Sequence, residues 1–99
     1  MEKLREKKAL EIIIEDLQIL QLQLLAEYEV NSKNIKAYDI DLSVSKNQNI
    51  NEDFFNKLKK STLKLKESKI VIEENIEALS KNIEIYKTRY NNLTDTIIL

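Results

Sequence analysis

The sequence contains no glycine, proline, cysteine, histidine or tryptophan among its 99 residues. A chain of average composition and this length would hold roughly 7 glycines and 5 prolines. β-Sandwiches, barrels and doubly wound sheets depend on tight turns and positive-φ positions that these two residues usually supply. A mostly helical chain with few connections needs almost none of them. The composition therefore predicts an all-α protein.

The missing residue types also exclude much chemistry. Without cysteine and histidine there can be no disulfide, thiolate nucleophile, imidazole acid–base pair or ordinary transition-metal site. Without glycine there is no loop of the kind that cradles phosphates. We therefore expect a non-catalytic protein that has no catalytic residues, no cofactor and no metal.

Long hydrophobic runs are absent as well. The leucine- and isoleucine-rich stretch over residues 10–25 is interrupted by acids and glutamines, and it falls short of the ~20 apolar residues of a membrane span. The charged start of the chain is a poor signal peptide. We expect a cytoplasmic protein without membrane contact. Lysine outnumbers arginine 14 to 2, which is typical of an AT-rich genome such as that of a phage, a plasmid or some bacteria.

The C-terminal half carries the clearest pattern. Apolar residues recur in alternating steps of three and four from Phe55 to Ile97, and only Thr62 and Lys69 interrupt them. Asn51 is a good N-terminal capping residue, since acidic residues follow it in the first turn. This pattern predicts a helix over residues 51–94.

The N-terminal half predicts a helix over residues 2–36 with two apolar stripes on opposite sides. Ile14 and Leu25 widen the main stripe, which follows Leu10, Ile13, Leu17, Leu20, Leu24 and Tyr28. The second stripe consists of Ile12, Ile19, Leu22 and Val30. A helix needs only one stripe to pack on one neighbour. We therefore expect a homodimer or a higher assembly. Its predicted core comprises Leu10, Ile13, Leu17, Leu20, Leu24, Ile72, Ile76, Leu79 and Ile83.

The connecting segment, residues 37–50, allows two interpretations. Apolar and polar residues alternate from Tyr38 to Ser45, which is the period of a β-strand. Ile35, Tyr38 and Leu42 also fit helical spacing, so a continued helix remains open. We expect an extended or loop segment. The predicted fold is an elongated antiparallel helical hairpin, a coiled coil, that assembles into a dimeric helical bundle.

Two groups of residues outside the expected core are candidate partner sites. Tyr38, Ile40, Leu42 and Val44 could present an unpaired strand edge to a partner, or they could fold back and close the end of the bundle. The second group, Ile97, Ile98 and Leu99, ends the chain with three apolar residues.

Six lysines lie within residues 57–69, and Lys57, Lys60 and Lys64 are candidate anion contacts. The alternative is that these lysines pair with the first helix, which is rich in acids. Lys69 falls in the middle of the apolar register, where it could fix the register or form a buried ion pair with Asp16 or Glu27.

The chain has two long predicted helices around the alternating segment from Tyr38 to Val44. In this layout it resembles the prefoldin β subunit. That resemblance implies a holdase chaperone subunit. From the residues themselves we expect a protein that binds itself and another protein, such as a small adaptor or inhibitor of a host protein. A helical nucleic-acid-binding protein that uses the lysine cluster is a further hypothesis.

Overall fold

The computed structural model describes the backbone of residues 2–45 and 51–98 and the side chains up to Leu93. Helix α1 comprises Glu2–Ser45 and helix α2 comprises Glu52–Ile98. No strand occurs in these described ranges. The prediction of an all-α helical hairpin is confirmed.

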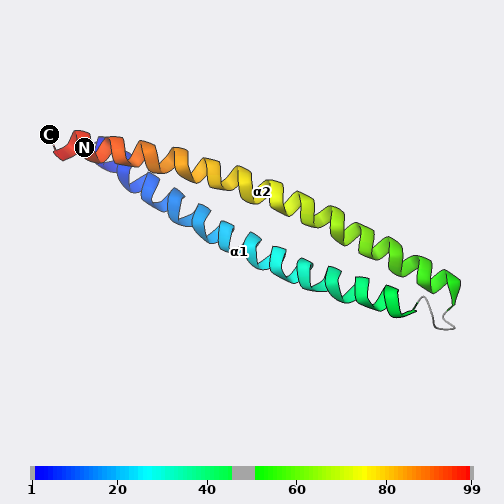
Figure 1. Cartoon of the computed structure of the whole chain (residues 1–99). Coiled ribbons are helices and arrows are strands. Elements are labelled where there is room, and N and C mark those ends of the chain that lie inside the picture. Colours follow the sequence, from blue (N-terminus) through cyan, green and yellow to red (C-terminus); the bar gives the residue numbers. More distant parts are fainter. Residues whose placement is uncertain (1, 46–50, 99) are drawn as a thin grey trace. The chain divides into compact units, whose positions relative to one another are not determined.

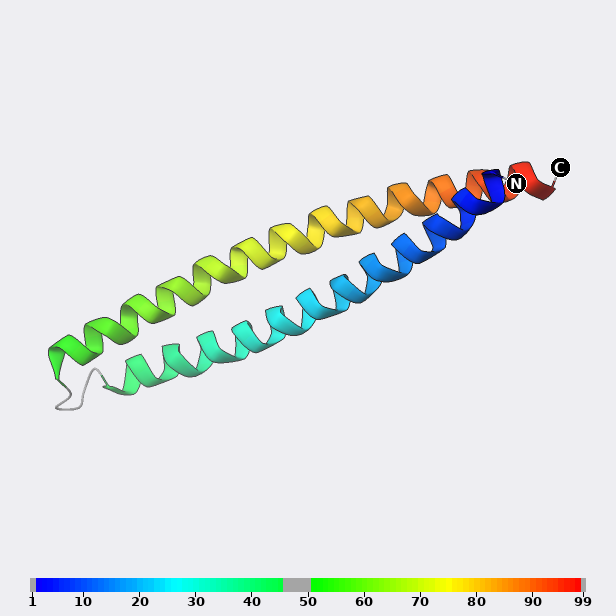
Figure 2. The ribbon, with the colours of Figure 1, turned by 180° about the vertical axis from the view of Figure 1, so that it is seen from behind.

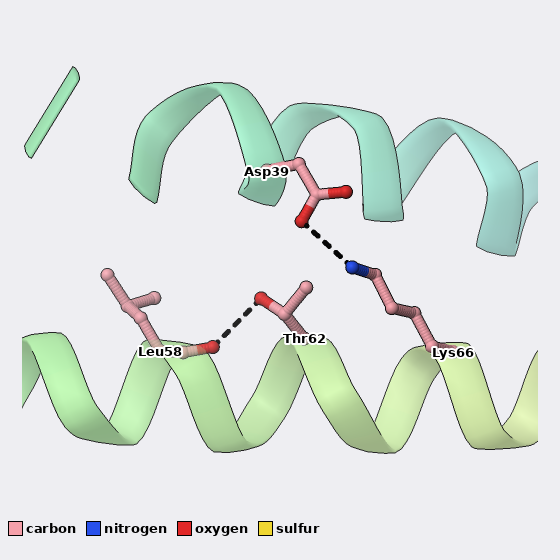
Figure 3. A network of polar contacts seen from close by, with 4 residues as sticks. All are labelled: Asp39, Leu58, Thr62 and Lys66. Carbon is pink, nitrogen blue, oxygen red and sulfur yellow. Dashed lines mark hydrogen bonds and ion pairs between the residues drawn. The ribbon is translucent and has the colours of Figure 1, made fainter. Parts of the chain in front are cut away.

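The hairpin divides into two units. The terminal unit comprises Met1–Leu24 and Asn75–Leu99, and the middle unit comprises Leu25–Glu74. Within each unit a segment of α1 lies beside a segment of α2 (Figures 1 and 2). The segments are antiparallel, because Glu11 contacts Tyr90 and Gln21 contacts Ser80 in the terminal unit. In the middle unit Asp39 of α1 faces Lys66 of α2 (Figure 3).

The register predicted for the second helix is confirmed as far as the side chains are described. Positions outside this register on α2 are exposed, except for half-buried Ser80. The helix therefore packs through one narrow stripe, as a coiled-coil seam does. The buried or half-buried positions are Phe55, Leu58, Thr62, Leu65, Lys69, Ile72, Ile76, Leu79, Ile83, Tyr86, Tyr90 and Leu93.

The predicted cap of α2 is also present. The side-chain Oδ1 of Asn51 accepts hydrogen bonds from the backbone N–H of Asp53 at 2.9 Å and of Phe54 at 3.4 Å. The backbone carbonyl of Asn51 accepts the first helical hydrogen bond, from the N–H of Phe55 at 3.0 Å. Asn51 thus satisfies N–H groups of the first turn that have no partner inside the helix.

The register predicted for the first helix was partly wrong. Ile14 and Gln21 are half-buried on the face toward α2, whereas Ile13 and Leu20 are exposed at 38% and 44%. The steps from Leu10 through Ile14, Leu17, Gln21 and Leu24 to Tyr28 alternate four and three without a break. A stripe through Ile13 and Leu20 would instead take two consecutive steps of four residues, between Leu20 and Tyr28. An unbroken alternation keeps the stripe facing one partner, even though it places polar Gln21 inside.

The prediction of an extended or loop segment over residues 37–50 was wrong for residues 37–45, because α1 continues to Ser45, and residues 46–50 lie outside the described residues. Ile35 and Ser45 are buried at 9% and 5% exposure and Leu42 is half-buried, so the heptad stripe of α1 persists against α2. A lone strand would leave its backbone groups unpaired, whereas the continued helix satisfies them internally. Packing on α2 and backbone hydrogen bonding therefore override the local alternation.

Candidate protein-binding face

Helix α1 presents apolar side chains on the side that α2 does not cover. Ile12, Ile19 and Leu22 are 61%, 52% and 67% exposed, and all three belong to the terminal unit. Exposed Ile13 and Leu20 widen this surface on one flank. We call these five residues the outer α1 face. Val30, the fourth residue of the predicted second stripe, lies in the middle unit and is 58% exposed.

The outer α1 face is apolar with a few acids and no bases. Between residues 9 and 32 the chain contains no lysine or arginine. Glu15 and Asp16 stand between Ile12 and Ile19 in sequence, and both are exposed. Several large apolar side chains exposed along one helix are typical of an interaction site on a soluble domain. The acids along it favour a partner that brings positive charge.

The seam side of the terminal unit holds the polar contacts between the helices. The Nε2 of Gln21 donates to the Oγ of Ser80 at 2.7 Å, and the hydroxyl of Tyr90 donates to the Oε1 of Glu11 at 2.8 Å. Lys7 lies 5.4 Å from the ring centroid of Tyr90. The three tyrosines on the predicted registers, Tyr28, Tyr86 and Tyr90, are half-buried in the hairpin.

The first predicted partner site does not form a strand edge. Tyr38, Ile40, Leu42 and Val44 lie on α1, so their backbone groups belong to the helix and cannot pair with a partner strand. The helix divides the four side chains between faces. Leu42 points toward the seam and is half-buried, Tyr38 is 38% exposed, and Ile40 and Val44 are 66% and 55% exposed.

The second predicted partner site, Ile97, Ile98 and Leu99, lies outside the residues whose side chains are described.

The predicted assembly core separates into two groups. Within the hairpin Leu10, Leu79 and Ile83 are buried, and Leu17, Leu24, Ile72 and Ile76 are half-buried. Ile13 and Leu20 instead belong to the outer α1 face. These two residues remain exposed, whereas the other seven lie in the seam between α1 and α2.

The six clustered lysines of α2 also separate into two groups. Lys66 pairs with Asp39 at 3.3 Å, Lys59 lies 4.7 Å from the ring centroid of Phe55, and Lys69 lies 5.1 Å from that of Tyr28. Lys69 therefore contacts an aromatic ring rather than Asp16 or Glu27. The predicted anion contacts Lys57, Lys60 and Lys64 are exposed, and no hydrogen bond, ion pair or ring contact to another described residue is found for them.

One shallow depression, of about 330 Å3, lies in the terminal unit. Its lining residues are Glu11, Ile14, Glu15, Gln18 and Tyr90. The described residues contain no group of three or more acidic side chains placed to hold a metal ion. In the same part of the chain, neither helix has a stretch long and apolar enough to cross a membrane.

Comparison of the chain with family models, with curated proteins and with solved structures finds no match. The segment from Tyr38 to Val44, which supported the resemblance to the prefoldin β subunit, is helical. The candidate face thus rests on the chain's own exposure and charge.

Proposed function

We propose that the protein is a non-catalytic protein–protein interaction module that assembles with further copies of itself through the outer α1 face. The observation that carries this proposal is the exposure of Ile12, Ile19 and Leu22 on a helix whose opposite side already packs on α2. Each of these side chains would gain about 1 kcal/mol or more if a second copy covered it. A homodimer is the smallest such assembly.

A hairpin of only two helices also has a physical reason to assemble. Its core is a single seam, in which only Leu10, Ile35, Leu79 and Ile83 are buried apolar residues among the described side chains. Cores of this size rarely stabilise a small domain alone, and oligomerisation is one common remedy. The same face that binds a second copy would then stabilise the fold.

Sedimentation equilibrium at micromolar concentration tests the proposal. We expect the wild type to exceed its monomer mass of 11.7 kDa. The double variant Ile12→Gln, Ile19→Gln should remain a monomer, because two amides replace the apolar contact while helix propensity is kept. Circular dichroism must show unchanged helix content. A monomeric wild type would overturn the proposal.

The matched control is Ile85→Gln. Ile85 belongs to the same unit and is 58% exposed, but it lies on α2, away from the outer α1 face. We expect this variant to assemble like the wild type. Loss of assembly in the control would show that general hydrophobicity, and not the outer α1 face, drives the association.

A further inference from the structure

Helix α2 carries a surface of the opposite charge in the middle unit. Lys57, Lys60 and Lys64 are spaced by three and four residues, so they share one face of the helix. Apolar side chains adjoin them along α2: Leu63, Ile70 and Val71 are 58%, 55% and 53% exposed. We call these six residues the basic α2 face. Over residues 57–71 the chain has six lysines and one acid, Glu67.

The three lysines of this face make no hydrogen bond, ion pair or ring contact with another described residue. The neighbouring Lys59, Lys66 and Lys69 contact Phe55, Asp39 and Tyr28 and so help to hold the hairpin. Lys60 and Lys64 instead stand one turn apart, where like charges destabilise a helix slightly. A partner with acidic side chains would relieve that repulsion.

The outer α1 face has the matching chemistry. Residues 9–32 hold five acids and no base, and Glu15 and Asp16 lie between the apolar residues that the face exposes. No hydrogen bond or ion pair to another described residue is found for either acid. Both faces therefore combine exposed aliphatic side chains with unpaired charge, and the sign of the charge differs.

We propose that the outer α1 face of one copy docks on the basic α2 face of another copy. This inference rests on the proposed function and identifies the surface that covers the outer α1 face. Packing α1 on α1 would bring two sets of Glu15 and Asp16 together without any lysine or arginine between residues 9 and 32. Complementary charge at the rim of an apolar contact favours packing of the outer α1 face on the basic α2 face instead.

This contact joins two different faces. Each copy can therefore bind one neighbour through its outer α1 face and another through its basic α2 face. The copies then form either a closed ring or an open chain. Because the charges are exposed, added salt should weaken the association. A purely apolar α1–α1 contact would not weaken in this way.

Charge reversal tests the arrangement. The variant Lys60→Glu, Lys64→Glu and the variant Glu15→Lys, Asp16→Lys should each raise the dissociation constant of self-association by about tenfold or more. An equimolar mixture should associate again, since each variant then finds the opposite charge on the other. The control Lys33→Glu, Lys36→Glu changes two exposed lysines of the middle unit outside both faces and should associate like the wild type.

The outcomes separate the two proposals. If the wild type is monomeric, the proposed function fails. If the wild type assembles and the Lys60, Lys64 variant assembles equally well, α1 packs on α1 and the present inference is overturned. Duplex DNA provides a third arm: if the wild type binds it, the lysine variant does not, and mixing restores no association, the basic α2 face serves nucleic acid instead.

Discussion

The two units of the hairpin have the same construction but different interiors. In the terminal unit the buried side chains are apolar: Leu10, Leu79 and Ile83 are exposed by 2%, 8% and 5%. In the middle unit Thr62 and Ser45 are buried together with Ile35. Buried hydroxyls contribute less to stability than buried aliphatic groups, since they must first lose their hydration. The heptad pattern is therefore the same in both units, but the interior of the middle unit should contribute less to stability than that of the terminal unit.

The polar contacts between the helices also differ in kind between the two units. The terminal unit joins its helices through Gln21 and Ser80, Glu11 and Tyr90, and Glu6 and Arg89. The middle unit joins its helices through the ion pair of Lys66 and Asp39 and the contact of Lys69 with the ring of Tyr28. There Thr62 donates to the carbonyl of Leu58 on its own helix at 2.9 Å (Figure 3), and the hydroxyl of Ser32 is buried without a partner. We expect the terminal unit to resist local opening better than the middle unit.

The largest expected effect comes from breaking the terminal core. Leu10→Ala removes the most deeply buried apolar side chain and should lower the free energy of unfolding by about 3 kcal/mol. Urea unfolding followed by circular dichroism at one fixed protein concentration measures the loss. Leu4→Ala is the control, because Leu4 lies on the same helix and is 48% exposed. Equal losses in the two variants would contradict the packing described for Leu10.

A repair of the middle unit should have the next largest effect. Ser32→Ala removes the buried, unpaired hydroxyl and improves helix propensity, so it should raise the free energy of unfolding by about 1–2 kcal/mol. The control Ser68→Ala, at an exposed position of the same unit, should gain only about 0.5 kcal/mol from propensity. Amide hydrogen exchange should slow in the middle unit of the Ser32 variant. A destabilised variant would mean that the hydroxyl has a partner.

The hydrogen bond between Gln21 and Ser80 should contribute about 1 kcal/mol to the terminal unit. A double-mutant cycle with Gln21→Ala and Ser80→Ala isolates this coupling energy from the effects of each single change. A coupling energy near zero would show that the bond does not distinguish the terminal unit from the middle one.

The smallest effect is expected at the ion pair of the middle unit. Lys66 and Asp39 are both 48% exposed, so a cycle with Lys66→Ala and Asp39→Ala should give less than about 0.5 kcal/mol, decreasing as salt is added. The pair of Glu6 and Arg89 in the terminal unit, with a distance of 3.5 Å and similar exposure, is the matched comparison. A coupling above 1 kcal/mol in the middle unit would reverse the ranking of the two units.

The residues of the candidate face could be found in part from spacing. Ile12, Ile19 and Leu22 fall on a second stripe of the first helix in the sequence, and they are exposed in the structure. Ile13 and Leu20 were assigned to the main stripe of this helix, because Ile13 and Ile14 are equally apolar and a stripe can run through either. Gln21 decides between them: it points inward because Ser80 lies opposite to receive its hydrogen bond.

Local chemistry was sufficient for the helical class, the cap at Asn51 and the seam of α2, since each depends on residues close together in the chain. Tertiary contact decided the path of residues 38–45, and the hydrogen bond from Gln21 to Ser80 together with the heptad spacing decided the register of α1. The alternation from Tyr38 to Val44 satisfies the strand period and the helix period, and only the presence of α2 makes burial of Ile35, Leu42 and Ser45 in one stripe favourable. The contacts of Lys59, Lys66 and Lys69 likewise depend on which side chains the folded hairpin places beside them. Lys57, Lys60 and Lys64 are exposed in the same structure.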